Sequence, residues 1–287
     1  MTDNRALLVL WPTGKCNLNC KYCYASVVKS KHKMAFETAK KAVDYFKDYH
    51  LKIQFSGGEP LLNFELIEKV YEYVREMRYN ASFQLQTNGT LITAEMAKKL
   101  KQMRFSIGVS MDGPPEINEF LRGQTANLVS GMKHLSHENI TVNINSVVTA
   151  LNADRMAELA DLAMYFGNVA GIGLDLLRNA GSAKETSEEI KKATPEQIKN
   201  GVSSLHERCE YINRLTGMKL NVRSVSEAKM RLLAKGHSLE SHACNKNYCF
   251  ASMGRSFVVL PDGDVYPCGS LIDDERYLMG NILEDRP

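Results

Sequence analysis

The cysteines of this 287-residue chain are its clearest candidates for chemistry. Cys16, Cys20 and Cys23 have the spacing C-x3-C-x2-C directly after an apolar run that predicts a strand. Three thiolates can bind three irons of a cubane four-iron cluster and leave the fourth iron without a protein ligand. Such an open iron can bind a small molecule, whereas a cluster used only for electron transfer has four protein ligands. Zinc is the alternative metal, but structural zinc favours Cys pairs or Cys/His sets, and this loop contains no histidine.

The same segment resembles the signature of the radical S-adenosylmethionine (SAM) superfamily. Residues 16–24 read Cys-Asn-Leu-Asn-Cys-Lys-Tyr-Cys-Tyr, with an aromatic residue after the third cysteine. The resemblance implies a four-iron–four-sulfur (4Fe-4S) cluster whose open iron is chelated by the amine and carboxylate of SAM. It further implies a one-electron cleavage of SAM to a 5′-deoxyadenosyl radical, with a reductase such as flavodoxin or ferredoxin as the electron source. Tyr22 is among the residues that we expect to bind the cofactor.

A short turn motif follows the second predicted strand. It consists of Gly57, Gly58, Glu59 and Pro60. Glycine permits a close backbone approach, and a glutamate can accept a hydrogen bond from an ammonium group. In the radical SAM family this motif holds the methionyl amine, so the resemblance implies that these four residues bind the cofactor.

The resemblance implies further cofactor contacts at the ends of the next strands. Asn88 lies in a turn after the third strand, and Ser110 and Asp112 follow the fourth; such side chains can bond a ribose or a carboxylate. Arg122 matches an arginine that is frequent in peptide-modifying members, although a helical arginine is exposed by default. The segment 171–175 resembles the glycine-bearing strand that lies against adenine in the family.

A second group of cysteines lies near the C-terminus. It contains Cys244, Cys249 and Cys268, with an Asp-Gly-Asp hairpin turn at 262–264. This arrangement resembles the opening half of the SPASM auxiliary-cluster domain of radical enzymes. The closely spaced cysteines of the second half have no place before Pro287, so we expect at most one auxiliary 4Fe-4S cluster, as in the shortened twitch version.

The sequence does not identify the fourth ligand of that cluster or the catalytic residue. The ligand candidates are Cys209, His242, a substrate atom and a residue outside the sequence, although a cysteine in a helix is typically a packing residue. Sulfatase-maturing members use an acidic residue directly after the hairpin cysteine as the base, and Gly269 stands there in this chain. The remaining acidic candidates are Asp262, Asp264, Asp273 and Asp274.

The hydrophobic pattern predicts an α/β fold. Strand-like and helical stretches alternate about six times, which implies parallel strands in a partial (β/α)6 TIM-type barrel. The expected strands are Leu7–Trp11, Lys52–Phe55, Ser82–Gln86, Phe105–Val109, Thr141–Val148 and Ala170–Leu174, with a hairpin at Ser256–Leu260 and Val265–Cys268. The expected helices are Phe36–Tyr49, Phe64–Met77, Ala94–Met103, Ala153–Phe166 and Thr194 to about Leu215. We expect a core barrel at 1–180, a connector with helices at 181–243 and an auxiliary cluster-binding region at 244–287.

Composition indicates the cellular compartment and the classes of binding partner to expect. Its 44% hydrophobic and 24% charged residues are average for a soluble globular chain, and a net charge of +3 does not indicate a nucleic-acid or membrane surface. No apolar run approaches the roughly 18 residues of a membrane span, and the N-terminus does not resemble a signal peptide. We therefore expect a cytoplasmic protein with reduced thiols that binds neither nucleic acid nor membrane.

These observations favour a radical SAM enzyme of oxidoreductase type. The expected substrate is a peptide or protein from which hydrogen is abstracted, so that the product is oxidised or cross-linked. A radical SAM dehydrogenase or isomerase of a small metabolite is the first alternative. A non-catalytic iron–sulfur electron carrier is the second, against which Glu59, Ser110 and the open iron argue, because a carrier needs no methionine site.

Overall fold

One mixed sheet organises the part of the chain that the computed structural model describes, which is residues 4–28, 30–185, 190–234, 249–272 and 274–284. Its ten strands lie in the order β10-β9-β8-β1-β2-β3-β4-β5-β6-β7. All neighbours from β8 to β7 pair in parallel, whereas β9 and β10 add antiparallel pairs. The strands are β1 Arg5–Leu10, β2 His50–Phe55, β3 Ala81–Thr87, β4 Ser106–Ser110, β5 Val142–Val148, β6 Val169–Leu176, β7 Asn221–Val222, β8 Ser256–Val259, β9 Asp264–Tyr266 and β10 Gly280–Asn281.

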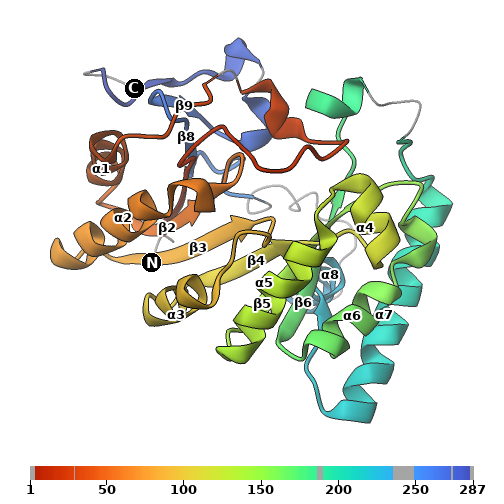
Figure 1. The fold of residues 1–287 in the computed structure, drawn as a ribbon. Coiled ribbons are helices and arrows are strands. Elements are labelled where there is room, and N and C mark those ends of the chain that lie inside the picture. Colours follow the sequence, from red (N-terminus) through yellow and green to blue (C-terminus); the bar gives the residue numbers. More distant parts are fainter. Residues whose placement is uncertain (1–3, 29, 186–189, 235–248, 273, 285–287) are drawn as a thin grey trace.

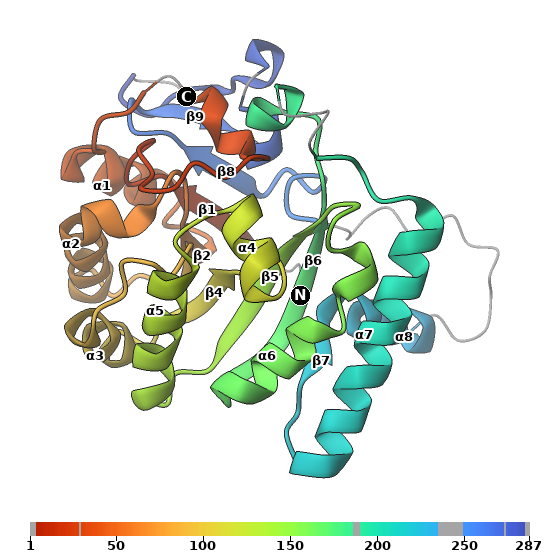
Figure 2. The same ribbon diagram turned by 45° about the vertical axis from the view of Figure 1, so that its right-hand side comes forward.

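Helices connect the parallel strands and cover the outer side of the curved sheet (Figures 1 and 2). Because β10 and β7 are the two edges of the sheet and do not pair with each other, the barrel is open. The predicted α/β fold with a parallel sheet is thus confirmed. The helices are α1 Phe36–Tyr45, α2 Phe64–Glu76, α3 Ala94–Gln102, α4 Pro115–Leu121, α5 Thr125–His137, α6 Glu158–Phe166, α7 Pro195–Thr216 and α8 Arg223–Ala234.

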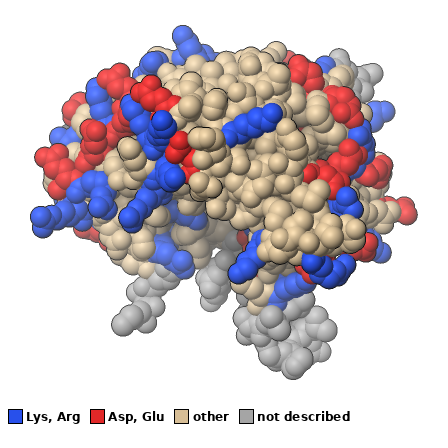
Figure 3. Space-filling view, turned by 60° about the horizontal axis from the view of Figure 1, so that its bottom comes forward, with Lys and Arg blue, Asp and Glu red and all other residues tan. Residues whose placement is uncertain are grey.

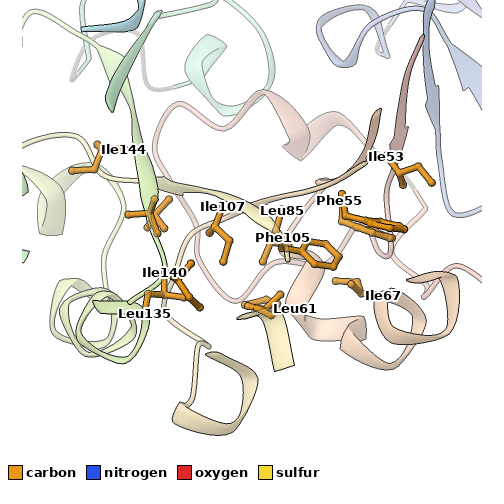
Figure 4. Close-up of a cluster of buried hydrophobic side chains, with 14 of the residues drawn as sticks. Ile53, Phe55, Leu61, Ile67, Leu85, Phe105, Ile107, Leu135, Ile140 and Ile144 are labelled. Atoms are coloured by element: carbon orange, nitrogen blue, oxygen red, sulfur yellow. The ribbon is translucent and has the colours of Figure 1, made fainter. Parts of the chain in front are cut away.

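The strand residues alternate between an apolar outer face and a polar inner face. In β2, Leu51, Ile53 and Phe55 are fully buried, whereas Lys52 and Gln54 are half-buried on the opposite face. Figure 4 shows such outward side chains of neighbouring strands packed together with side chains from the connecting helices. The hydrophobic core therefore lies between sheet and helices, and the inner face of the barrel is left to polar residues.

Local sequence signals set the helix ends. Thr194 and Gln197 form the capping box of α7, with Pro195 in the first turn, and Gly217 ends the helix with φ +75°. This helix lies within one residue of the predicted range.

Two other helices differ from the prediction. The first expected helix ends at Tyr45 rather than Tyr49. Another begins only at Glu158, because Ala153–Arg155 forms a separate 3-10 turn. A Cβ at Gly201 of α7 would lie 2.1 Å from the Ala153 carbonyl oxygen, so α7 packs directly against that turn.

The C-terminal hairpin is part of the barrel sheet. Strands β8 and β9 pair as the Asp-Gly turn predicts, and Gly263 in that turn has φ +95°. Strand β8 also pairs in parallel with β1 from Leu7 to Leu10. The Phe257 ring of β8 stacks on Phe46 after α1, with 4.0 Å between centroids. The hairpin is thereby fixed beside the start of the barrel.

The surface carries both charge signs. On the face drawn in Figure 3, basic and acidic side chains are interspersed around a broad uncharged area. None of the helices in the described ranges combines the length and apolar composition that a membrane span requires.

Truncating a core leucine tests this packing. Leu51→Ala removes a fully buried side chain between β2 and its helices and should lower the free energy of unfolding by about 2–5 kcal/mol. Leu215→Ala is the matched control, because Leu215 is 67% exposed, and its effect should stay within about 0.5 kcal/mol. Anaerobic urea unfolding of the apo-protein measures both changes. Equal effects would contradict the assignment of Leu51 to the core.

Candidate functional site

A cavity of about 360 Å³ lies at the carboxyl ends of the barrel strands. Its wall includes residues at the ends of β3 to β6 and the loop that follows β1, where functional sites of parallel barrels lie. The volume is within the usual range for small-molecule sites.

The three N-terminal cysteines line this cavity together. Cys16, Cys20 and Cys23 belong to the loop between β1 and the 3-10 turn Tyr24–Val27. Burial raises the pKa of Cys20 to about 11, while the nearby Arg122 guanidinium opposes the shift. Burial also raises the pKa of Cys16. The Cys16 and Cys20 thiols therefore favour the protonated form in the metal-free protein, and metal binding has to displace those protons.

The donor set fits an iron–sulfur cluster better than a single ion. Among the described residues, no three His, Cys, Asp or Glu side chains converge as ligands of one ion. A four-iron cluster is larger than one ion and needs thiolates that are further apart on one cavity wall. Cys16, Cys20 and Cys23 all line the same cavity, so one cluster in that cavity could be bound by all three.

The Gly57-Gly58 turn packs against the cysteine loop. A Cβ at Gly58 would lie 2.0 Å from the Lys15 carbonyl oxygen, and Gly57 has φ +121°. The Glu59 backbone N–H donates to the same Lys15 oxygen at 2.8 Å. Both glycines line the cavity, and the turn requires them because any side chain at Gly58 would push the two loops apart.

Glu59 lies behind the cavity wall rather than in it. Its Oε1 accepts from the Thr87 hydroxyl at 2.7 Å and the Leu61 N–H at 3.2 Å, and its Oε2 accepts from the Asn88 N–H at 2.8 Å. Pro60 follows as the first residue of a 3-10 turn, and neither Glu59 nor Pro60 lines the cavity. Three protein donors thus use this carboxylate, and the expectation that it also binds a ligand stays a prediction.

Asn88 and Ser110 reach the cavity as the sequence indicated. The Asn88 amide nitrogen lies 3.0 Å from Asn17 Oδ1 and 3.8 Å from Cys16 Sγ. Ser110 accepts a hydrogen bond from Gln86 Nε2 at 3.1 Å. Asn88 therefore fastens the end of β3 to the cysteine loop.

Tyr22, Asp112 and Arg122 form a buried polar cluster beside Cys20. The Tyr22 hydroxyl donates to Asp112 Oδ2 and accepts from Arg122 Nη1, and Asp112 Oδ1 accepts from the Val147 N–H at 2.8 Å. Arg122 directly follows α4, and its side chain is only 11% exposed, which corrects the default expectation of an exposed arginine. Tyr22 and Arg122 line the cavity, whereas Asp112 holds them from behind.

Several lining residues were not predicted. They project inward from strands or follow their ends: Gln54, Gln86, Asn145, Asp175, Arg178 and Arg223. The available signal was the alternation within the strands. In β2, for example, every second residue is polar, and these residues face away from the covering helices. Arg223 is the first residue of α8 and directly follows β7, a two-residue strand that the hydrophobic pattern did not predict.

Cys249 and Cys268 do not line the cavity. Cys249 is exposed, Cys268 is half-buried, and Cys244 and His242 lie outside the described residues, as does Asp273. The loop after Cys268 approaches the first cysteine loop, because a Cβ at Gly269 would lie 3.5 Å from the Tyr24 hydroxyl. The structure argues against Cys209 as a cluster ligand, because it is fully buried in the main core.

Comparison with known proteins agrees with this site. The model of the Radical SAM superfamily matches residues 12–163. An uncharacterised protein of Methanocaldococcus jannaschii is 34% identical, over 98% of this chain and 90% of that protein. A cysteine-type anaerobic sulfatase-maturating enzyme of Clostridium perfringens is 28% identical, over 97% of this chain and 78% of that enzyme. The solved structure of native anSMEcpe with bound AdoMet and the Kp18Cys peptide has a TM-score of 0.81 and 27% identity, and it covers 98% of this chain and 79% of that one.

The chain belongs to the radical SAM superfamily. Membership implies a 4Fe-4S cluster and SAM, and the predicted family is confirmed. Its relatives include peptide-modifying maturases.

The buried position of Glu59 predicts a pH dependence of stability. Burial raises its pKa from 4.5 to about 7, although its three hydrogen-bond donors oppose the shift. The folded state therefore binds this proton more tightly than the unfolded state, and the resulting stabilisation is lost as the pH rises through about 7. The unfolding free energy of the wild type minus that of Glu59→Gln should fall between about pH 5 and about pH 8. Urea unfolding of both apo-proteins measures it, and a flat or rising difference would contradict the assignment.

Proposed function

We propose that this protein is a radical SAM enzyme that abstracts hydrogen from a peptide or protein substrate and so initiates its oxidation or cross-linking. The observation that carries the proposal is a single cavity that holds the three cysteines at one end and the polar inner face of the barrel at the other. When bound, the cluster and SAM supply a 5′-deoxyadenosyl radical.

The residues around the cavity have distinct roles in this proposal. Cys16, Cys20 and Cys23 hold the cluster, and the Gly57-Gly58 backbone provides a flat wall against which SAM can lie. Arg122 offers a cation to the SAM carboxylate, since Tyr22 and Asp112 already fix its guanidinium. Glu59 acts as a positioning residue, because it bonds the turn and the end of β3 but does not reach the cavity.

A peptide substrate is supported by the relatives that share most of the chain. The anSMEcpe structure contains AdoMet and a peptide together, and its identity of 27% extends over 98% of this chain. The inner barrel face offers amide side chains such as Gln54, Gln86 and Asn145, which suit hydrogen bonds to a peptide backbone. An electron carrier would need no such cavity beside its cluster.

An auxiliary 4Fe-4S cluster at Cys249 and Cys268, together with Cys244, is the second part of the proposal. Its support is the hairpin that fixes Cys268 next to the barrel, where Arg178 donates to the Ser270 hydroxyl and lies 5.5 Å from the centre of the Tyr24 ring. A cluster in this position would lie close enough to the cavity to take an electron from the substrate.

The central claim is tested by SAM cleavage. Anaerobically reconstituted protein with dithionite should form 5′-deoxyadenosine, and Cys16→Ala, Cys20→Ala or Cys23→Ala should abolish this, because each removes a cluster anchor. Cys209→Ala is the matched control and should retain the activity, since Cys209 lies in the core. Wild-type turnover in any of the three cavity variants would refute the proposal.

The auxiliary cluster is tested separately by iron content. Wild type should bind about twice the iron of the Cys249→Ala/Cys268→Ala variant, while both retain the first cluster. Iron analysis with Mössbauer spectroscopy provides the measurement. Equal iron in the two proteins, or zinc at the C-terminal site, would leave an enzyme with one cluster.

A further inference from the structure

The inside of the barrel contains a polar pocket. Inward positions of a closed barrel are filled by branched apolar side chains, but here they carry amides, serine and glycine. A pocket of about 100 Å³ remains between them, which is space for about three water molecules. It is lined by Gln54, Gln84, Leu85, Gln86, Ser106, Ile107, Gly108, Asn143, Asn145 and Arg223.

This pocket continues into the main cavity. Gln54, Gln86, Asn145 and Arg223 line both spaces. A group that occupies the pocket would therefore be part of a molecule that also reaches toward the cysteine end. The pocket is suited to anchor one end of a substrate.

Two glycines make room for the polar groups. A Cβ at Gly108 would lie 2.4 Å from Gln86 Oε1, and one at Gly173 would lie 2.6 Å from Asn145 Oδ1 and 2.7 Å from Arg223 Nη2. The Arg223 guanidinium thus lies over β6, next to the Asn145 amide. Any side chain at Gly173 would displace it.

Hydrogen bonding leaves one acceptor in the pocket wall unused. Asn145 Nδ2 donates to Gln86 Oε1 at 2.6 Å, but Asn145 Oδ1 is buried and has no partner in the described structure. A buried acceptor without a donor costs free energy, so the packing around Gly173 holds the Asn145 amide in this place, beside the Arg223 guanidinium. The wall therefore presents a cation beside a neutral amide.

Arg223 is the charged residue in the lining of the pocket. None of the residues that line the pocket is acidic, and the carboxylate paired with Arg223 is that of Glu227, at 4.0 Å. Both side chains of this pair are about half exposed, so solvent weakens the attraction. The pKa of Lys52 is lowered by burial and then by repulsion from Arg5 and Arg223, so these cations act on one another across the barrel.

We propose that Arg223, which lines both the pocket and the main cavity, binds a carboxylate of the substrate. This inference rests on the proposed function and specifies its substrate class as a peptide with a carboxylate close to the modified residue. The carboxylate can belong to an Asp or Glu side chain or to the C-terminus of the peptide. Arg223 is then a specificity-determining residue.

Three small probes separate these sources. N-acetylglutamate α-amide carries a side-chain carboxylate, N-acetylalanine carries a terminal carboxylate, and N-acetylglutamine α-amide is uncharged. Ligand-observed NMR titrations of the reconstituted full chain with SAM give the dissociation constants. We expect at least one carboxylate probe to bind wild type clearly more tightly than the glutamine probe. The tighter-binding carboxylate identifies its source.

Variants of Arg223 complete the test. Arg223→Gln should weaken binding of that probe about tenfold or more, because a charge-assisted hydrogen bond is lost, and Arg223→Lys should give an intermediate affinity. Arg208→Gln is the matched control and should bind like wild type, since Arg208 pairs with Asp161 on the outer helices. Melting temperatures of all variants check that they are folded.

Three results would overturn the inference. In the first, wild type and Arg223→Gln bind both carboxylate probes with equal affinity. In the second, wild type binds the charged and uncharged probes equally well. In the third, neither carboxylate probe binds. SAM cleavage by the same wild-type preparation decides the proposed function independently. If the protein cleaves SAM but does not bind the carboxylate probes, the proposed function stands and only the proposed substrate class is wrong.

Discussion

The close approach of two backbone segments is the constraint on which the rest of the site depends. The turn at Gly58 touches the Lys15 carbonyl at a distance that excludes any Cβ. This contact places the cysteine loop at the carboxyl end of β2, beside the cavity. The carboxylate of Glu59 then bonds both this turn and the end of β3 from a fully buried position. One buried acid thereby fixes the relative positions of three loops.

Burial and charge compensate each other around the cysteines. Cys20 is almost fully buried, which disfavours its thiolate, but the Arg122 guanidinium lies near enough to oppose that effect. Tyr22 and Asp112 hold this guanidinium in place. A buried cation of this kind suits a site that must accept anionic sulfur and a ligand carboxylate, provided that every charged group keeps a partner.

The open barrel explains how one sheet can have an apolar outer face and a polar inner face. Its outer face packs Leu51, Ile53 and Phe55 under the helices, whereas the inner face carries Lys52 and Gln54. Because the sheet does not close, the inner face need not be filled by apolar side chains. The C-terminal strand β8 extends the sheet at β1 and so brings the second cysteine region to the barrel.

The sequence by itself determined most helices and strands of the barrel and the position of the cysteine loop. The alternation of apolar and polar residues, the capping residues and the C-x3-C-x2-C spacing are all local signals. It predicted β1 to β6 to within a few residues, but not β7 or the parallel pairing of β8 with β1. It predicted the ends of α7 closely, because Thr194, Pro195 and Gly217 act within a turn. Only the tertiary structure decided which residues line the cavity: the Glu59 carboxylate bonds Thr87 and is not part of the lining, whereas Arg223, directly after β7, is. These outcomes depend on contacts between segments far apart in the chain, and no local spacing encodes them.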